Sequence, residues 1–192
     1  MIFLDLFAIV FFILLAPIPI LSGIFQYNPK WFRRFGNWNY VGVVNFYFVT
    51  AIVTLNYLYI IIMLRYPLTQ PLVIAGGVIL VIGCIISYIA GRTLTLKTLI
   101  SLPQIHPERY RQQLVTNGLY KIMRHPRYIG YWMMALGFAM TTGLLLMWLF
   151  FIWLIVGLAA LALLEERELR QRFGKEYADY MRRVPAFIPK FF

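Results

Sequence analysis

Four basic residues stand together in GLYKIMRHPRYIG, residues 118–130, just before a long apolar run. Pro126 suits the first position of a helix and favours an extended backbone at His125. The imidazole would then lie at a helix N-terminus, where backbone donors favour anions, and Arg124 and Arg127 add positive charge. The pattern predicts a site for a carboxylate or a phosphate.

Carboxylates stand at the far end of the same apolar run, in LLEERELRQRFGKEYADY. Glu165 and Glu166 would lie at a membrane surface, where a carboxylate needs a partner or a cationic ligand. Arg170 is expected to pair with Glu166, and Glu168 with Arg172, one helical turn apart. One carboxylate is then left as a candidate to bind an ammonium group.

The composition indicates the elements that position these residues. The chain of 192 residues is 61% hydrophobic and 13% charged, whereas soluble domains are about 25% charged. Stretches without Asp, Glu, Lys or Arg cover residues 6–29, 35–64, 66–91 and 128–164. Each exceeds the roughly 20 residues that cross a bilayer. The sequence therefore predicts an all-α, polytopic membrane protein.

The last apolar stretch is too long for one membrane span. Residues 128–164 would form a helix about 55 Å long, nearly twice the bilayer core. Thr141-Thr142-Gly143 supplies turn chemistry near the middle, so we expect a tight hairpin and five transmembrane helices in total. The hairpin would bring the two polar stretches together in one interfacial pocket.

Charge predicts the orientation of the five spans. Lys and Arg number three in residues 26–40, seven in 92–127 and seven in 165–192, against Arg65 alone on the other side. By the positive-inside rule the C-terminus is cytoplasmic and the N-terminus lies outside. The expected location is the cell membrane of a prokaryote, or the endoplasmic reticulum of a eukaryote.

Other features have structural interpretations. The net charge of +11 does not indicate nucleic-acid binding, because the basic residues flank apolar spans. Cys84 is the only cysteine, so no thiolate metal site is predicted. Pro17 and Pro19 should bend the first span. Gly76, Gly77 and Gly83 should allow close helix packing.

The motifs GLY-x(4)-RHP-x-Y-x-G, an acidic pair and FG-x-E-Y-x-x-Y-x-x-x-VP-x-x-IP together resemble the isoprenylcysteine carboxyl methyltransferase family, within the wider phospholipid methyltransferase group. The resemblance covers residues 92–192, the expected catalytic region, while residues 1–91 would form a scaffold of three spans. It implies binding of S-adenosylmethionine on the cytoplasmic side without a Rossmann domain, and no metal is expected. The implied cofactor-binding residues are Gln112, Gln113, Leu114 and Val115 at the nucleoside, Tyr120 beside the cofactor, His125, Pro126, Arg127 and Tyr128 at its methionine part, and Glu165 at its amino group.

The resemblance also implies an acceptor, the C-terminal carboxylate of a prenylated cysteine. That carboxylate is ionised at neutral pH and needs no general base. Arg124 is the candidate to orient it, and Glu166 would be the base if the acceptor were an amine. The prenyl chain would enter sideways from the bilayer, beside Gly130 and Gly137.

Three alternatives remain open from the sequence. The acceptor could be a phospholipid amine or a small thiol or alcohol. Eukaryotic members of the family carry an arginine that contacts the substrate about one turn before the acidic pair. Leu161 and its neighbours stand at that place here, which leaves the choice of acceptor open. An NADPH-dependent sterol or enone reductase would carry a basic HRxxRD-type stretch in place of LLEEREL. A lipid-binding scaffold would use the polar groups only as anchors.

Overall fold

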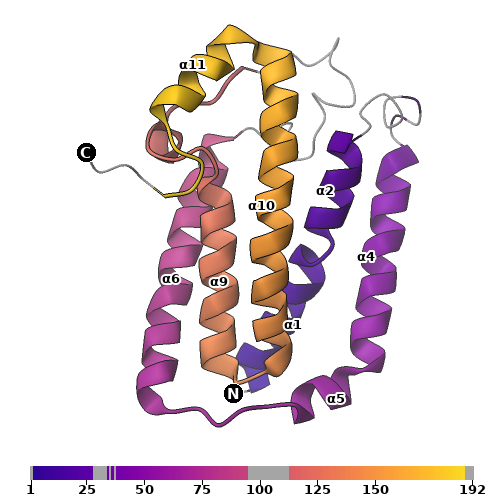
Figure 1. The fold of residues 1–192 in the computed structure, drawn as a ribbon. Coiled ribbons are helices and arrows are strands. Elements are labelled where there is room, and N and C mark those ends of the chain that lie inside the picture. Colours follow the sequence, from indigo (N-terminus) through magenta and orange to yellow (C-terminus); the bar gives the residue numbers. More distant parts are fainter. Residues whose placement is uncertain (1, 28–33, 35, 37, 95–112, 189–192) are drawn as a thin grey trace.

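The computed structural model describes residues 2–27, 34, 36, 38–94 and 113–188, and the elements in this part of the chain are helices (Figure 1). The all-α class is confirmed there. The helices are α1 (Ile2–Leu15), α2 (Ile18–Tyr27), α4 (Trp38–Asn56), α5 (Leu58–Met63), α6 (Gln70–Thr93), the 3-10 helix η1 (Gly118–Lys121), α9 (Pro126–Thr142), α10 (Leu145–Phe173) and α11 (Lys175–Arg183).

Four helical segments of the described chain are long and apolar enough to cross a membrane: Phe3–Ile24, Trp38–Asn56, Gln70–Thr93 and Leu145–Phe173. This confirms a polytopic membrane protein. Helix α9, with 17 residues, is not among the four and lies between α6 and α10 (Figure 1). The count of five spans therefore stays a prediction.

The predicted hairpin is confirmed. Helix α9 ends at Thr142, and Gly143 follows with φ of 72°, a left-handed conformation that glycine adopts without strain. The Thr142 hydroxyl accepts a hydrogen bond from the Leu144 N–H at 3.3 Å. Further along, the Trp132 indole donates to the Leu154 carbonyl at 2.9 Å. These bonds hold α9 and α10 antiparallel.

Helices α6 and α9 pack through glycines that recur at the same spacing on both. A Cβ atom on Gly83 would stand 2.9 Å from the Gly130 carbonyl oxygen, and one on Gly76 would stand 3.1 Å from that of Gly137. The close packing expected of Gly76 and Gly83 is confirmed. For Gly77 the expectation was wrong, because its Cβ position has no atom within 4 Å.

The bend in the first span is confirmed, because α1 ends at Leu15 and α2 begins at Ile18. Prolines at 17 and 19 remove backbone donors there. Side chains from other helices donate to carbonyls at the break: Tyr47 to Leu14 at 3.1 Å and Trp153 to Ala16 at 3.0 Å. Such compensation is what an apolar environment demands of a broken helix.

The end of the bundle that holds the hairpin turn also holds the N-terminal helix. The Tyr66 N–H donates to the Gly143 carbonyl at 3.0 Å, and the Leu145 N–H donates to that of Leu64 at 3.1 Å. Arg65 forms a salt bridge with Asp5 of α1 at 2.8 Å. The start of α9 and the end of α10 lie at the opposite end, beside α11 (Figure 1).

Candidate functional site

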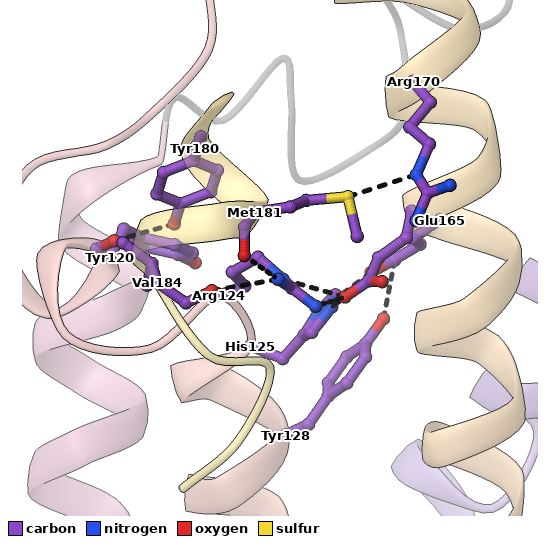
Figure 2. Close-up of polar contacts among 10 residues, drawn as sticks. Tyr120, Arg124, His125, Tyr128, Glu165, Arg170, Tyr180, Met181 and Val184 are labelled. Carbon is purple, nitrogen blue, oxygen red and sulfur yellow. Dashed lines mark hydrogen bonds and ion pairs between the residues drawn. The ribbon is translucent and has the colours of Figure 1, made fainter. Parts of the chain in front are cut away.

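The hairpin brings the two polar stretches into direct contact at the α11 end (Figure 2). His125 Nε2 lies 3.1 Å from Glu166 Oε1, and His125 Nδ1 lies 3.5 Å from Glu165 Oε2. The imidazole, 7% exposed, is held directly before Pro126, the buried first residue of α9. The predicted meeting of these distant stretches is confirmed.

The chain after α11 runs alongside Arg124 and His125. The backbone N–H groups of these two residues donate to the carbonyls of Pro185 at 2.9 Å and of Ala186 at 3.0 Å. The Phe187 ring then lies 5.4 Å from the imidazole ring, centre to centre. No pattern in the sequence indicated that the C-terminal segment covers the histidine.

Arg124 ties the end of α10 to the end of α11. Its Nε and Nη2 donate to Glu166 Oε1 at 2.9 and 2.6 Å, and its Nη1 donates to the carbonyls of Met181 at 3.1 Å and Val184 at 2.9 Å. The Arg124 and Glu166 side chains are only 10% and 11% exposed. The Arg124 guanidinium therefore binds groups of the protein itself.

One predicted ion pair is wrong. Arg170 does not pair with Glu166 and instead donates to the Met181 sulfur at 3.2 Å (Figure 2). The physical reason is burial: a carboxylate turned into the protein takes partners across the interior, while Arg170 stays exposed on the outer face of α10. The expected pair of Glu168 with Arg172 is confirmed.

Glu165 is oriented by an aromatic side chain. The Tyr128 hydroxyl donates to Glu165 Oε1 at 2.6 Å. The Tyr128 ring stacks on His125 with 5.3 Å between centres and 7° between planes. The Glu165 side chain is 30% exposed, so this carboxylate is fixed in place yet accessible from outside.

The environment of His125 favours its charged form. Burial opposes the imidazolium, but hydrogen bonds to Glu165 and Glu166 outweigh it and raise the pKa of His125 above its ordinary value. With Arg124 included, two basic side chains face two carboxylates. The expectation that His125 presents a site for an anion is therefore wrong, because both ring nitrogens face carboxylates.

Tyrosines of η1 and α11 close the other side of the cluster. The Tyr180 hydroxyl donates to the Tyr120 carbonyl at 2.7 Å. Burial raises the pKa of the Tyr120 phenol, while Arg127 lowers it and Glu165 raises it. Tyr180 was not among the predicted site residues. Its spacing from Tyr177 and Val184, an apolar face along one helix, was the signal that pointed to a buried side chain.

The remaining predicted residues lie around this cluster. Gln113 is exposed, Val115 is partly buried, and Leu114 packs against the cluster of Tyr177, Tyr180 and Val184. Gln112 lies outside the described residues. Arg127 donates to the Tyr131 hydroxyl at 2.6 Å.

A bundle of apolar helices with paired charges at one end defines a polytopic membrane protein with a polar site where its helices end. Residues 71–176, more than half of the chain, match the phospholipid methyltransferase family. The chain belongs to this family, and the resemblance found in the motifs is confirmed.

Several relatives are named methyltransferases. The chain is 33% identical over 108 residues to protein-S-isoprenylcysteine O-methyltransferase B of Arabidopsis thaliana, a match covering 52% of this chain and 48% of the relative. It is 37% identical over 84 residues to protein-S-isoprenylcysteine O-methyltransferase of Schizosaccharomyces pombe, covering 40% and 33%. It is 42% identical over 86 residues to methanethiol S-methyltransferase 2 of Bradyrhizobium diazoefficiens, covering 42% and 30%.

The chain spans less than two thirds of the length of these relatives. No solved structure matches it.

Proposed function

We propose that this protein transfers a methyl group from S-adenosylmethionine to the carboxylate of a prenylated cysteine at the membrane surface. The observation that carries the proposal is Glu165, a partly exposed carboxylate fixed by Tyr128 and His125 where the membrane helices end. The relatives named protein-S-isoprenylcysteine O-methyltransferase support the substrate.

The chemistry of these side chains fits the proposed methyl donor. S-adenosylmethionine carries an ammonium and a sulfonium group and, when bound, supplies an electrophilic methyl group. Carboxylates and aromatic rings are the groups that bind such cations. Glu165 would bind the ammonium, with Tyr120 and Tyr128 beside it. The residues from Gln112 to Val115 would line the nucleoside, and His125 and Pro126 would lie beside the methionine part.

The residues of the chain would act by binding and orientation. A carboxylate acceptor is already ionised at neutral pH, so no residue has to remove a proton. Alignment of the reactants and exclusion of water would supply the acceleration. Arg124 and Glu166, the predicted catalytic residues, bind each other in the interior. We therefore assign them a positioning role, which is to hold His125 and the C-terminal segment in place.

We further propose that α9 is a fifth span and that the site faces the cytoplasm. The hairpin geometry supports the span, because α9 runs antiparallel to α10. The excess of Lys and Arg at the site end supports the side. Residues 1–91 would then form the scaffold and residues 92–192 the catalytic region. The seam between α6 and α9, where Gly76 and Gly83 contact Gly137 and Gly130, joins these two regions.

A small thiol is the second candidate acceptor. It is favoured by the relatives named methanethiol S-methyltransferase, which are 42% identical over 86 residues. A thiol acceptor, unlike a prenylated cysteine, would bring no carboxylate group of its own into the site.

The test is methyl transfer by the purified protein in detergent. Labelled S-adenosylmethionine is supplied with N-acetyl-S-farnesylcysteine, phosphatidylethanolamine or methanethiol. Label in the farnesylcysteine methyl ester is expected. Label only in the thioether or the lipid would overturn the proposed acceptor.

Binding of S-adenosylhomocysteine by calorimetry tests the cofactor site separately. Glu165→Gln should weaken this binding about tenfold to hundredfold, through loss of a charge-assisted hydrogen bond. Glu176→Gln, an exposed glutamate on α11, is the matched control and should leave it unchanged. Folded wild-type protein that does not bind would favour a scaffold without enzymatic activity.

A further inference from the structure

The site contains one cation that its carboxylates do not neutralise. Arg124 is bound to Glu166, and His125 lies between Glu165 and Glu166. In the described part of the chain, no carboxylate lies within ion-pair distance of Arg127. Its printed hydrogen bond is the one donated to the Tyr131 hydroxyl at 2.6 Å. The guanidinium also lies 5.6 Å from the centre of the Tyr131 ring.

Arg127 and Tyr131 lie on a helix face that points into the bundle. Positions 127, 131 and 138 share one side of α9, because four and eleven residues are close to whole numbers of helical turns. Phe138 on this side contacts Phe11 of α1, with ring centres 5.1 Å apart. Arg127 itself is partly buried.

Arg92 shows what a lipid-facing arginine looks like in this protein. It is exposed at the end of α6 and lies 5.7 Å from the ring centre of Tyr88, itself 64% exposed. Its geometry over a tyrosine matches that of Arg127, but its surroundings do not. Snorkelling to headgroups accounts for Arg92 and does not account for Arg127.

Arg127 directly precedes Tyr128 in α9, and the Tyr128 hydroxyl donates to Glu165, the proposed cation-binding carboxylate, at 2.6 Å. A cation at position 127 and a carboxylate bound by the neighbouring residue suit two ligand groups of opposite sign. Glu165 would take an ammonium, and the guanidinium would take an anion.

We propose that Arg127, held by Tyr131, binds the carboxylate of the methyl acceptor and selects acidic acceptors over neutral ones. The inference rests on the proposed function, which it deepens by naming the residue that recognises the acceptor. A guanidinium has five N–H donors. With one on Tyr131, the others remain for a carboxylate, whose geometry they match.

The test is a binding measurement that needs no turnover. N-acetyl-S-farnesylcysteine and its carboxamide are titrated into the purified protein, with tryptophan fluorescence as the signal. The wild type should bind the acid about tenfold to hundredfold more tightly than the amide, the size of a hydrogen bond to a charged group. Arg127→Gln should abolish this preference, and Arg127→Lys should keep part of it. Arg92→Gln, the matched control, should keep all of it.

Binding of S-adenosylhomocysteine to the same variants identifies the source of the anion. Unchanged affinity in Arg127→Gln shows that the variant is folded and that the anion belongs to the acceptor. If that affinity falls while the preference for the acid persists, Arg127 binds the carboxylate of the cofactor and the inference is wrong. An acid preference that Arg127→Gln leaves intact overturns it as well.

The two proposals fail separately. Loss of the acid preference in Arg127→Gln, with no methyl ester formed by the wild type, would support this inference and reject the proposed function. Methyl ester formation by the wild type, together with an acid preference that is unchanged in Arg127→Gln, would support the proposed function and reject this inference.

Discussion

At the scale of residues, the site is a buried network of charges in which each side chain fixes another. Arg124 and His125 face Glu165 and Glu166. Buried charges are tolerated when they are paired and hydrogen-bonded, and removing one partner leaves the other uncompensated. The orientation of Glu165, on which the proposed function depends, therefore requires the whole network.

The raised pKa of His125 predicts a pH dependence of stability. Its folded pKa lies above the ordinary value of 6.5, owing to hydrogen bonds with Glu165 and Glu166 that outweigh burial. The stabilisation is therefore complete below pH 6.5 and is lost as pH rises through the folded pKa. Thermal unfolding in detergent should show a melting temperature that falls as the pH rises from about 6 through the raised pKa of His125.

His125→Gln is the control for this dependence. The variant keeps a polar side chain but cannot titrate, so its melting temperature should be lower at pH 6 and change less with pH. A wild-type melting temperature that rises over this range would contradict the assignment of the charged imidazole.

Sequence patterns predicted that the two polar stretches meet but misassigned some of their partners. His125 and Glu165 could be expected to lie close together because a helix start and a helix end flank one apolar hairpin, whereas Tyr128 was named only through the family resemblance. The partner of Glu166 could not be predicted in this way, because pairing rules within a helix favour Arg170, one turn away. Arg124, 42 residues away, became the partner only through packing between helices.

At the scale of elements, the seam between α6 and α9 fixes the start of α9 and therefore His125. Gly76 and Gly83 on α6 face Gly137 and Gly130 on α9, and the two glycines on each helix are seven positions apart. Backbones approach so closely that side chains are excluded. Small residues at such positions are how membrane helices pack without a hydrophobic driving force.

Gly137→Ala should separate these two helices. Its Cβ would stand 2.7 Å from Leu80 Cβ and 2.8 Å from the Gly76 carbonyl oxygen, so backbone must move. We expect a loss of about 1–3 kcal/mol in stability, the cost of overpacking, measured by thermal unfolding in detergent.

Gly77→Ala is the matched control on the same seam helix. It meets no atom within 4 Å, so it should be neutral or stabilise by up to about 1 kcal/mol through higher helix propensity. Equal effects of the two substitutions would show that the seam is not tightly packed.

The sequence predicted that glycines pack here but not which of two neighbours does so. Gly76 and Gly77 differ by 100° around the helix, and an apolar helix offers no polar face to show which side is inward. The position of α9 determines which of the two glycines packs against a helix.

At the scale of the whole molecule, hydropathy predicts which segments enter a membrane but not their neighbours. Helix α4 was expected as a span, and its length and composition fit. Yet within it only Asn39 and Thr54 are buried, and it stands at the edge of the bundle (Figure 1). Apolar side chains pack against lipid as readily as against protein, so composition alone could not place this helix.

The end opposite the site is held by an ion pair that joins three parts of the chain. Asp5 of α1 is 5% exposed and lies 2.8 Å from Arg65. Arg65 also donates to the carbonyls of Ile62 at 2.7 Å and of Thr142 at 3.3 Å. Within the described residues, the second oxygen of Asp5 is buried without a hydrogen bond. This carboxylate therefore depends on Arg65.

Arg65→Met should cost about 3–5 kcal/mol of stability in detergent, the cost of stranding a buried charge. Adding Asp5→Leu removes that charge and should restore stability to within about 1 kcal/mol of the wild type, since apolar replacements of buried pairs are often neutral. Arg182→Met is the control, because its pair with Asp179 is exposed and such pairs contribute about 0–1 kcal/mol. If the double variant is no more stable than Arg65→Met, the guanidinium matters through its backbone carbonyls, and the three segments are joined by Arg65 without Asp5.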